Sequence, residues 1–344
     1  MFEKSCNIIV GENGSGKTNI LEGISLFDKG RGFRKDKLHN LININNSGEG
    51  FKISTTYKNQ RNNYNINVFS SDKNSKKISI NNSVQNESIR YFESILSIIY
   101  FLPEMERLFL STPSSRRNFL DRLIFTSIKK YNSIINSYKN AINERQLLLK
   151  SSSYDYSWIE KLEQDIVKFG SIIYLYRVEH IKTINKILKQ LEIIKHFSHN
   201  FFIKINDNFL NKHPKIFIDQ DMYLFELKNS RKIDFLSGGC NIGPHRSDLS
   251  GFSLNNDFNI NQFSTGQQKT AILLIIIAQC KYLIDNLKLN PIVLLDEVCS
   301  HLDIFNRELI LYLIHELNVQ IFMTGTEEKL FSFLSTKAHY CNIT

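Results

Sequence analysis

The sequence predicts an α/β fold: a mixed β-sheet with an antiparallel β meander and an inserted α-helical lobe. The first indication is a short apolar run, Cys6–Val10, which leads through a glycine-rich turn into a helical pattern from Asn19 to Phe27. The second is the alternation of apolar and polar residues between residues 50 and 84, which is typical of antiparallel strands. The third is a helical spacing of apolar residues from Leu120 to Leu191.

The middle of the chain carries two apolar stripes at helical spacing, Leu120–Ile142 and Trp158–Leu191. Two such helices joined by a short polar loop would pack antiparallel. Beyond them we expect a long helix from Ser264 and four strand-like segments: Phe201–Ile205, Met222–Leu227, Pro291–Leu295 and Val319–Met323. The pattern predicts a discontinuous head, residues 1–103 and 198–344, with the helical lobe at residues 104–197.

The composition is that of a globular protein, with 42% hydrophobic and 22% charged residues. The formal charge of +9 favours an acidic partner such as nucleic acid. An AT-rich coding sequence would produce the same lysine excess, and both interpretations stay open. The 5 cysteines form no CxxC pair, and the longest apolar run, Ala271–Ala278, is too short to cross a bilayer. We therefore expect a reduced, cytoplasmic protein with no signal peptide and no membrane-spanning segment.

A glycine-rich segment matches the phosphate-binding pattern GxxxxGK[ST] at every fixed position. Its residues are Gly11, Glu12, Asn13, Gly14, Ser15, Gly16, Lys17 and Thr18. Because it follows a predicted strand and opens a helix, its backbone N–H groups would surround the phosphates of a nucleotide. Lys17 would neutralise the β- and γ-phosphates of ATP, and Thr18 would ligate Mg²⁺.

A second segment supplies carboxylates for the same site. The apolar run Ile292–Leu295 ends in Asp296 and Glu297, and nucleotides bind at the carboxyl ends of parallel strands. Asp296 would hold Mg²⁺ through water, and Glu297 would act as general base toward the attacking water. Combined with the glycine-rich segment, the two acids predict an enzyme that hydrolyses a nucleoside triphosphate.

Two segments resemble the signature motif with which one subunit of an ABC-type ATPase completes the ATP site of the other. That motif needs a serine and a glycine at the start of a long helix, where the helix dipole meets the γ-phosphate. Leu236-Ser237-Gly238-Gly239 has the expected letters, but the glycines and proline that follow exclude a helix. Ser264-Thr265-Gly266-Gln267 opens an unbroken apolar stretch, and Ser264 is a favourable N-cap. We therefore assign the signature to Ser264, Gly266 and Gln267.

Asp303 ends the segment Ser300-His301-Leu302-Asp303, which follows the two acids closely. The segment has the spacing of the loop that reaches across the dimer in ABC-type ATPases, where Asp303 would contact the opposite ATP site. The alternative is an ordinary helix cap.

These motifs, together with several others in the same order, resemble the RecF family of bacterial recombination-repair ATPases, which is related to the SMC proteins. The resemblance covers nearly the whole chain, from residue 7 to Thr326, and implies an ABC/SMC-type P-loop ATPase head. The further matching segments are Gly30–Arg34, Phe101–Glu104, Pro113–Asp121 and Gly243–Leu249.

The resemblance also implies a function. Two heads would dimerise on two ATP molecules, close over double-stranded or gapped DNA, and release it on slow, DNA-stimulated hydrolysis. Such a protein would act with RecR and RecO, and indirectly with RecA, in replication, DNA repair and the SOS response to DNA damage. A transporter-type ABC subunit, a structural SMC-like protein and a P-loop kinase are the rival interpretations. The first should have a complete LSGGQ motif, the second far longer helices, and the third no signature helix.

The sequence departs from the family pattern in three places. Family members carry a further strand pair ahead of the phosphate loop, so either Met1 is an internal start or the chain is truncated. The acid pair Asp296-Glu297 has the ABC form instead of two aspartates. Met323–Thr326 occupies the place of the family's threonine run and of the ABC switch histidine, so no histidine would sense the γ-phosphate there.

Four further residues have competing interpretations. Arg116 and Arg117 would meet DNA phosphates or the nucleotide, or Arg117 would pair with Asp121 on one helix surface. Glu104 would lie near Mg²⁺ or simply start a helix. Arg246 lies in a predicted loop and has no assigned role.

Overall fold

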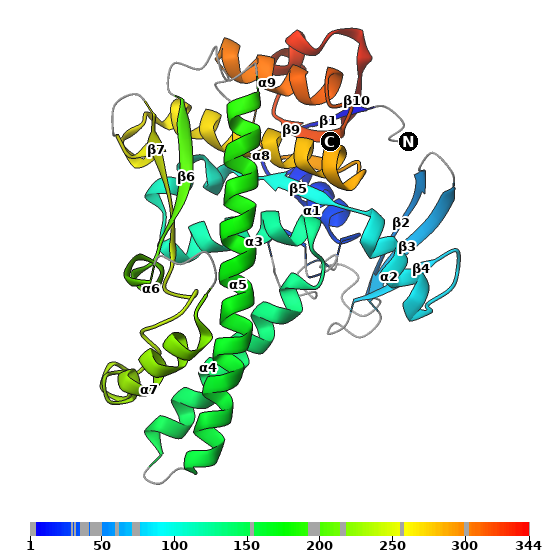
Figure 1. Ribbon diagram of the computed structural model, residues 1–344. Coiled ribbons are helices and arrows are strands. Elements are labelled where there is room, and N and C mark those ends of the chain that lie inside the picture. The colour runs from blue at the N-terminus through cyan, green and yellow to red at the C-terminus, as the bar shows by residue number, and fades with distance from the viewer. Residues whose placement is uncertain are drawn as a thin grey trace. The chain divides into compact units, whose positions relative to one another are not determined.

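The computed structural model describes residues 5–28, 30, 32–34, 41, 50–58, 62–70, 76–151, 155–191, 200–213, 218–254, 258–298 and 303–343. The chain divides into two compact units (Figure 1). The first comprises Met1–Met105 and Leu283–Thr344, and the second comprises Glu106–Tyr282.

A five-stranded sheet forms the centre of the first unit, with the strand order β10-β1-β9-β8-β5. The strands are β1 (Cys6–Val10), β5 (Ile98–Phe101), β8 (Ile292–Leu295), β9 (Gln320–Gly325) and β10 (Ala338–Asn342). All four pairings are parallel, whereas the sequence predicted a mixed sheet. The difference arises because the antiparallel strands of this unit form a separate sheet. The helices of the unit are α1 (Lys17–Ser25), α2 (Asn86–Ile95) and α9 (Ile304–His315), with a 3₁₀ segment at Glu328–Lys337. Another 3₁₀ segment, Pro103–Leu110, begins in this unit and ends in the second.

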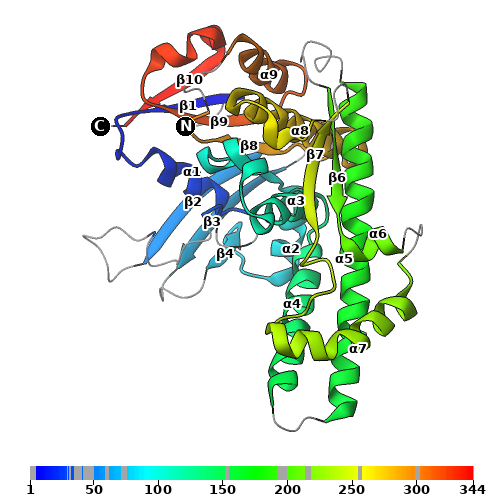
Figure 2. The ribbon, with the colours of Figure 1, turned by 90° about the vertical axis from the view of Figure 1, so that its left-hand side faces the viewer.

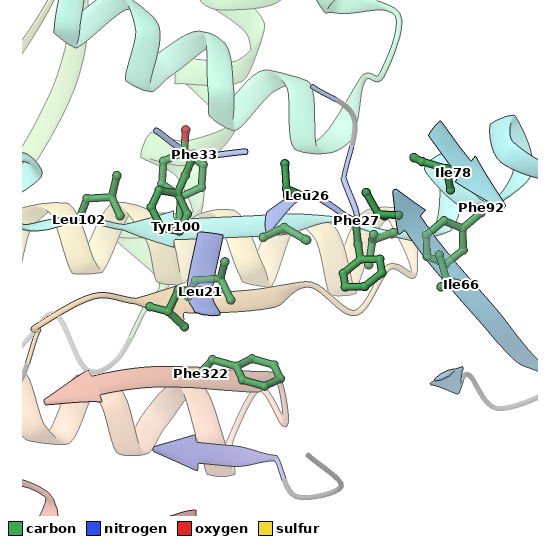
Figure 3. Packing of buried hydrophobic residues seen from close by; sticks show 14 of the residues in the cluster. Leu21, Leu26, Phe27, Phe33, Ile66, Ile78, Phe92, Tyr100, Leu102 and Phe322 are labelled. Atoms are coloured by element: carbon green, nitrogen blue, oxygen red, sulfur yellow. The ribbon is translucent and has the colours of Figure 1, made fainter. Parts of the chain in front are cut away.

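The separate sheet is the predicted antiparallel meander, which Figure 2 shows as three neighbouring strands. Its strands are β2 (Phe51–Lys58), β3 (Asn63–Ser70) and β4 (Lys77–Ile80). Ile66 and Val68 of β3 are buried and belong to the same apolar cluster as Leu21 of α1 and Leu26, the C-cap of that helix. Figure 3 shows residues of this cluster, which joins the meander, the first helix and the central sheet into one core.

The second unit is built on a helical hairpin, as the apolar stripes predicted. The first stripe, Leu120–Ile142, was expected to form one helix but is divided between two, of which the first ends at Ser127 and the second begins at Tyr131. Helices α4 (Tyr131–Lys150) and α5 (Tyr156–Gln190) lie side by side along much of their length (Figures 1 and 2). The other helices are α3 (Pro113–Ser127), α6 (Asn208–Lys212) and α7 (Gln220–Ser237), with a 3₁₀ turn at Ile260–Gln262. Strands β6 (Phe201–Asn206) and β7 (Asp248–Ser253) pair antiparallel.

Two features of this unit differ from the sequence prediction. Residues 198–282 were placed in the head, but they cluster with the helical elements, because β6 and β7 pair with each other and α7 packs on α4 and α5. Met222–Leu227, predicted as a strand, lies inside α7. Its helical state follows from Asp219, whose side chain caps the helix by accepting from the Met222 N–H at 3.1 Å.

The long helix α8 (Thr265–Leu287) is the predicted helix that begins near Ser264. Among the described residues it is the one helix whose length and composition would allow it to cross a membrane. Of its most apolar window, 67% is buried inside the protein, and Ala271–Ala278 are all fully buried. The core helix of a globular protein meets the same criteria, so this helix is weak evidence for a membrane segment.

Candidate nucleotide site

The glycine-rich segment Gly11–Thr18, here called the phosphate loop, joins the end of β1 to the start of α1. Gly14 and Gly16 have φ angles of +87° and +94°, which favour glycine. Gly16 is also the N-cap of α1 and offers no side chain to its first turn. The N–H groups at the start of α1 are therefore available to an anion, as the sequence predicted.

Lys17 and Ser15 are two side chains of this loop whose polar atoms are buried. Lys17 is buried, and its Nζ donates to the carbonyl oxygens of Gly11 at 2.8 Å and Glu12 at 2.7 Å. The buried Ser15 Oγ has no hydrogen-bond partner among the residues that the structure describes. A buried hydroxyl is normally paired, and a phosphate oxygen in the loop would supply its partner. The residues present therefore fit a nucleotide phosphate.

Thr18 and Asp296 meet although 278 positions separate them in the chain. Thr18 Oγ1 donates to Asp296 Oδ1 at 3.2 Å. Asp296 follows β8 directly and is buried, and its backbone N–H donates to Phe101 O on β5 at 2.9 Å. A hydroxyl and a carboxylate are the hard oxygen donors that Mg²⁺ prefers, so the pair fits the ion that the sequence predicted here.

Thr324, at the end of β9, contacts both acids of the site. Its Oγ1 donates to Asp296 Oδ1 at 2.7 Å and accepts the Glu297 N–H at 2.8 Å. Glu297 has a φ of +49°, uncommon for a residue with a side chain, and is exposed. The sequence places Met323–Thr326 where the family has a threonine run and ABC ATPases have the switch histidine, and it assigns Thr324 no contact with the acids. No local sequence signal identifies these contacts, because they depend on the pairing of β9 with β8, in which Leu295 lies opposite Met323.

The predicted signature segment, Ser264–Gln267, begins α8 in the second unit. Ser264 Oγ accepts the Gln267 N–H at 3.3 Å, and Gln267 Oε1 accepts the Ser264 N–H at 2.9 Å. This reciprocal pair is a capping box, so the predicted N-cap is confirmed. Ser264, Thr265 and Gly266 are exposed in the single chain.

The competing segment Leu236–Gly239 ends a helix instead of starting one. Ser237 is the last residue of α7, and Gly238 is its C-cap with a φ of +71°. Within the described stretch 238–254 the next regular element is the strand β7. The prediction that no helix follows this segment is therefore confirmed.

Asp303 is the N-cap of α9, and its Oδ1 accepts the Asn306 N–H at 2.7 Å. The cap interpretation is thus correct, and it does not conflict with a role at a second subunit because Asp303 is exposed. Ser300, His301 and Leu302 lie outside the described residues.

Two arginines with competing interpretations have structural partners. The Nε and Nη2 of Arg116 each donate to one carboxylate oxygen of Asp248 at 2.7 Å. Arg117 donates from Nη1 to Ser247 O at 2.7 Å. The alternative of an Arg117–Asp121 pair is not what the structure shows, because Asp121 accepts two hydrogen bonds from Arg177, each of 2.8 Å.

Arg246 and Glu104 differ in their surroundings. Arg246 donates from Nε to Cys240 O at 2.9 Å and from Nη2 to the Asn241 side chain at 3.2 Å. Glu104 is exposed in the 3₁₀ segment that follows β5. Its predicted role near Mg²⁺ gains no support from a contact among the described residues.

Comparison with known proteins agrees with this geometry. Residues 1–340 match the family described as "RecF/RecN/SMC N terminal domain". The "DNA replication and repair protein RecF" of Rickettsia conorii is 30% identical over 351 residues, which cover 96% of this chain and 91% of the relative. The chain belongs to the RecF family. The RecF of Rickettsia typhi is 29% identical over 334 residues, which cover 93% of this chain and 87% of the relative.

Solved structures of RecF share the fold. The structure of the recombination mediator RecF-ATPrS in the RecFOR pathway has a TM-score of 0.82 at 23% identity, covering 100% of this chain and 91% of that one. For RecF-ATP in the same pathway the TM-score is 0.76 at 24% identity, and the match covers 94% of this chain and 87% of that one. A Smc head domain from Pyrococcus furiosus has a TM-score of 0.50 at 17% identity, and the match covers 96% of this chain and 86% of that one. The predicted ABC/SMC-type head fold is thereby confirmed.

Proposed function

We propose that this RecF-family chain binds ATP and Mg²⁺ at the phosphate loop and uses slow hydrolysis as a switch for DNA binding in replication and recombinational repair. The observation that carries the proposal is the meeting of the phosphate loop with the acid end of β8, through the Thr18–Asp296 hydrogen bond of 3.2 Å. Nucleotide-bound RecF structures of the same fold support it.

The chain's own groups account for binding and hydrolysis. The N–H groups of the loop and of the first turn of α1 would bind the phosphates, and Lys17 would exchange its two carbonyl partners for phosphate oxygens. Thr18 and Asp296 would hold Mg²⁺, which when bound neutralises phosphate charge. Glu297 would accept a proton from the attacking water, whose oxygen bonds to the γ-phosphorus as the bond to ADP breaks.

A second copy of the chain would complete each site. Capping uses the Ser264 hydroxyl oxygen as an acceptor, so its O–H can still donate to a γ-phosphate of the partner. Gly266 is exposed and would allow close approach, and Gln267 and Asp303 would add polar contacts. Because ATP would lie between two copies, its binding would drive formation of the homodimer.

The dimer would act on double-stranded DNA near gaps, in the cytoplasm, with RecR and RecO as partners and RecA loading as the result. The relatives named as replication and repair proteins, and the RecFOR description of the solved structures, support this assignment. The formal charge of +9 fits a polyanionic partner. The SOS response to DNA damage is the setting in which the activity would be needed.

The proposal is tested with variants that separate ATP binding from dimerisation. Lys17→Ala should weaken ATP binding about tenfold to a hundredfold, because one cation leaves the phosphates, and should abolish ATP-dependent dimerisation and duplex binding. Ser264→Arg should keep ATP binding but prevent dimerisation. Equilibrium binding of a fluorescent ATP analogue, sedimentation velocity and DNA anisotropy measure the three properties.

Matched controls come from the same chain. Lys52→Ala removes an exposed lysine of β2, and Ser237→Arg places the same bulky cation in the competing Leu236–Gly239 segment. Both controls should behave as the wild type. Unchanged ATP-dependent dimerisation and DNA binding in Lys17→Ala would refute the proposed function.

A further inference from the structure

The Thr324 hydroxyl forms hydrogen bonds with both acids of the site. Thr324 is fully buried at the end of β9. Its single O–H donates to Asp296 Oδ1 at 2.7 Å, while its oxygen accepts the Glu297 N–H at 2.8 Å. The residue therefore fixes the side chain of one acid and the backbone of the next.

Asp296 Oδ1 accepts hydrogen bonds from two hydroxyl groups, which differ in their burial. The bond from Thr324 is 2.7 Å long, and the bond from Thr18 is 3.2 Å long. Thr18, the last residue of the phosphate loop, lies on α1 and is partly exposed, whereas Thr324 is buried in the sheet. If Thr18 turns toward a bound metal, Thr324 still orients the Asp296 carboxylate.

Glu297 depends on the same hydroxyl for its backbone. Its φ of +49° lies in the left-handed region, which costs a residue with a side chain about 1 kcal/mol. The hydrogen bond from its N–H to Thr324 holds the chain in this turn directly after β8. That turn fixes the point at which the exposed Glu297 side chain leaves the backbone.

We infer that Thr324 is a positioning residue for the hydrolytic site, acting through Asp296 and Glu297 without touching the nucleotide. The inference rests on the proposed ATPase function. In this role Thr324 would hold the Asp296 carboxylate, which binds the metal, at a fixed position relative to Glu297, which carries the base carboxylate. A purely structural hydroxyl that ties β9 to the end of β8 is the competing explanation.

The test replaces the hydroxyl and keeps the shape. Thr324→Val is nearly isosteric and removes both hydrogen bonds, Thr324→Ser keeps them, and Thr324→Cys keeps the size with a weak S–H donor. Thr126→Val is the matched control, because Thr126 is equally buried and its hydroxyl donates to Leu123 O at 2.7 Å and accepts from Gln279 at 2.8 Å in the other unit.

Two measurements separate positioning from stability. Titration of Mg²⁺ into protein with a fluorescent ATP analogue gives the half-saturating Mg²⁺ concentration without turnover, and steady-state kinetics give kcat and KM for ATP. Groups that orient metal ligands typically contribute tenfold to a hundredfold. We expect Thr324→Val to raise the half-saturating Mg²⁺ by about tenfold and to lower kcat by about thirtyfold, with KM little changed. Thr324→Ser should restore both, and Thr324→Cys should fall between them.

The outcomes distinguish the two proposals. If Thr324→Val melts at a lower temperature but keeps the wild-type Mg²⁺ requirement and kcat, the positioning role is overturned and the proposed ATPase stands. If Thr324→Val does not fold, the Thr324→Cys and Thr324→Ser pair decides, and equal values in these two variants overturn the role. A wild-type protein that neither binds Mg²⁺-ATP nor hydrolyses it overturns the proposed function itself.

Discussion

Arg145→Met tests the energetics of the helical unit most directly. Arg145 lies on α4 with 1% of its side chain exposed, and it joins three helices. Its Nε donates to Glu163 on α5 at 3.0 Å, and its Nη1 and Nη2 donate to Asp234 and the Leu227 carbonyl oxygen on α7 at 2.6 and 2.9 Å. The methionine keeps the apolar stem and removes the charge.

The expected cost follows from the groups left behind. Asp234 would keep hydrogen bonds from the Ser230 hydroxyl and from Asn241 but lose its cation, although its side chain is only 1% exposed. Removing one partner of a buried ion pair typically costs about 3–5 kcal/mol, because the remaining charge is uncompensated. Glu163 would keep Arg231, which donates to it at 2.6 and 2.9 Å. We therefore expect a loss of about 3 kcal/mol, at the lower end of that range.

Urea unfolding provides the assay. Trp158 is the single tryptophan of the chain and lies in the first turn of α5, so its fluorescence reports on this unit. Arg231→Met is the matched control. Arg231 is 20% exposed, and its removal leaves Glu163 paired with Arg145. It should cost less than half as much.

The second replacement Asp234→Asn in the Arg145→Met background removes the uncompensated charge. It should recover at least about 1 kcal/mol relative to the sum of the single changes. A loss below about 1 kcal/mol for Arg145→Met would refute the reasoning, since the buried carboxylate would then not need its cation.

Two further predictions concern buried groups of the same unit. Gly243→Ala should destabilise this unit by about 3 kcal/mol, because Gly243 has a φ of +133° and an added Cβ would clash with Tyr138 Oη. Unfolding in urea, followed by Trp158 fluorescence, measures the loss, and wild-type stability of the variant would contradict this prediction. Burial lowers the pKa of His180 from 6.5 to about 4, so the unfolded chain binds the proton more tightly and stability falls as the pH drops from 6.5 toward 4. Between pH 7 and pH 5 the wild type should lose about 2 kcal/mol more than His180→Leu, and parallel pH curves for the two proteins would exclude this effect.

The nucleotide loop and the acid-tipped strand could be predicted because their information is local. The glycines at positions 14 and 16 require positive φ angles, and the apolar run before Asp296 requires a buried strand. Each feature therefore predicts its own conformation. Thr18 opens the helix after the loop that follows β1, and Asp296 directly follows β8, so the two residues meet beyond the carboxyl ends of strands in the same parallel sheet.

The contacts of Thr324 and Asp121 could not be predicted, because they depend on which distant elements become neighbours. Thr324 reaches Asp296 because β9 lies between β1 and β8 in the sheet. The residues of one strand do not determine which strands become its neighbours. Asp121 has Arg117 one helical turn away, yet it pairs with Arg177 on α5. A bidentate pair to a buried guanidinium is stronger than an exposed pair within one helix, so tertiary packing overrides the local spacing.

The two signature-like segments show that helix position, more than letters, decides which of them can serve a phosphate. A helix carries about half a positive charge at its N-terminus and half a negative charge at its C-terminus. Ser264 and Gly266 lie at the start of α8, where the charge and the N–H groups favour an anion. Ser237 and Gly238 lie at the end of α7, where carbonyl groups would repel one. Gly238 therefore serves to end a helix, and the Ser264–Gln267 segment is the one that a partner's ATP could use.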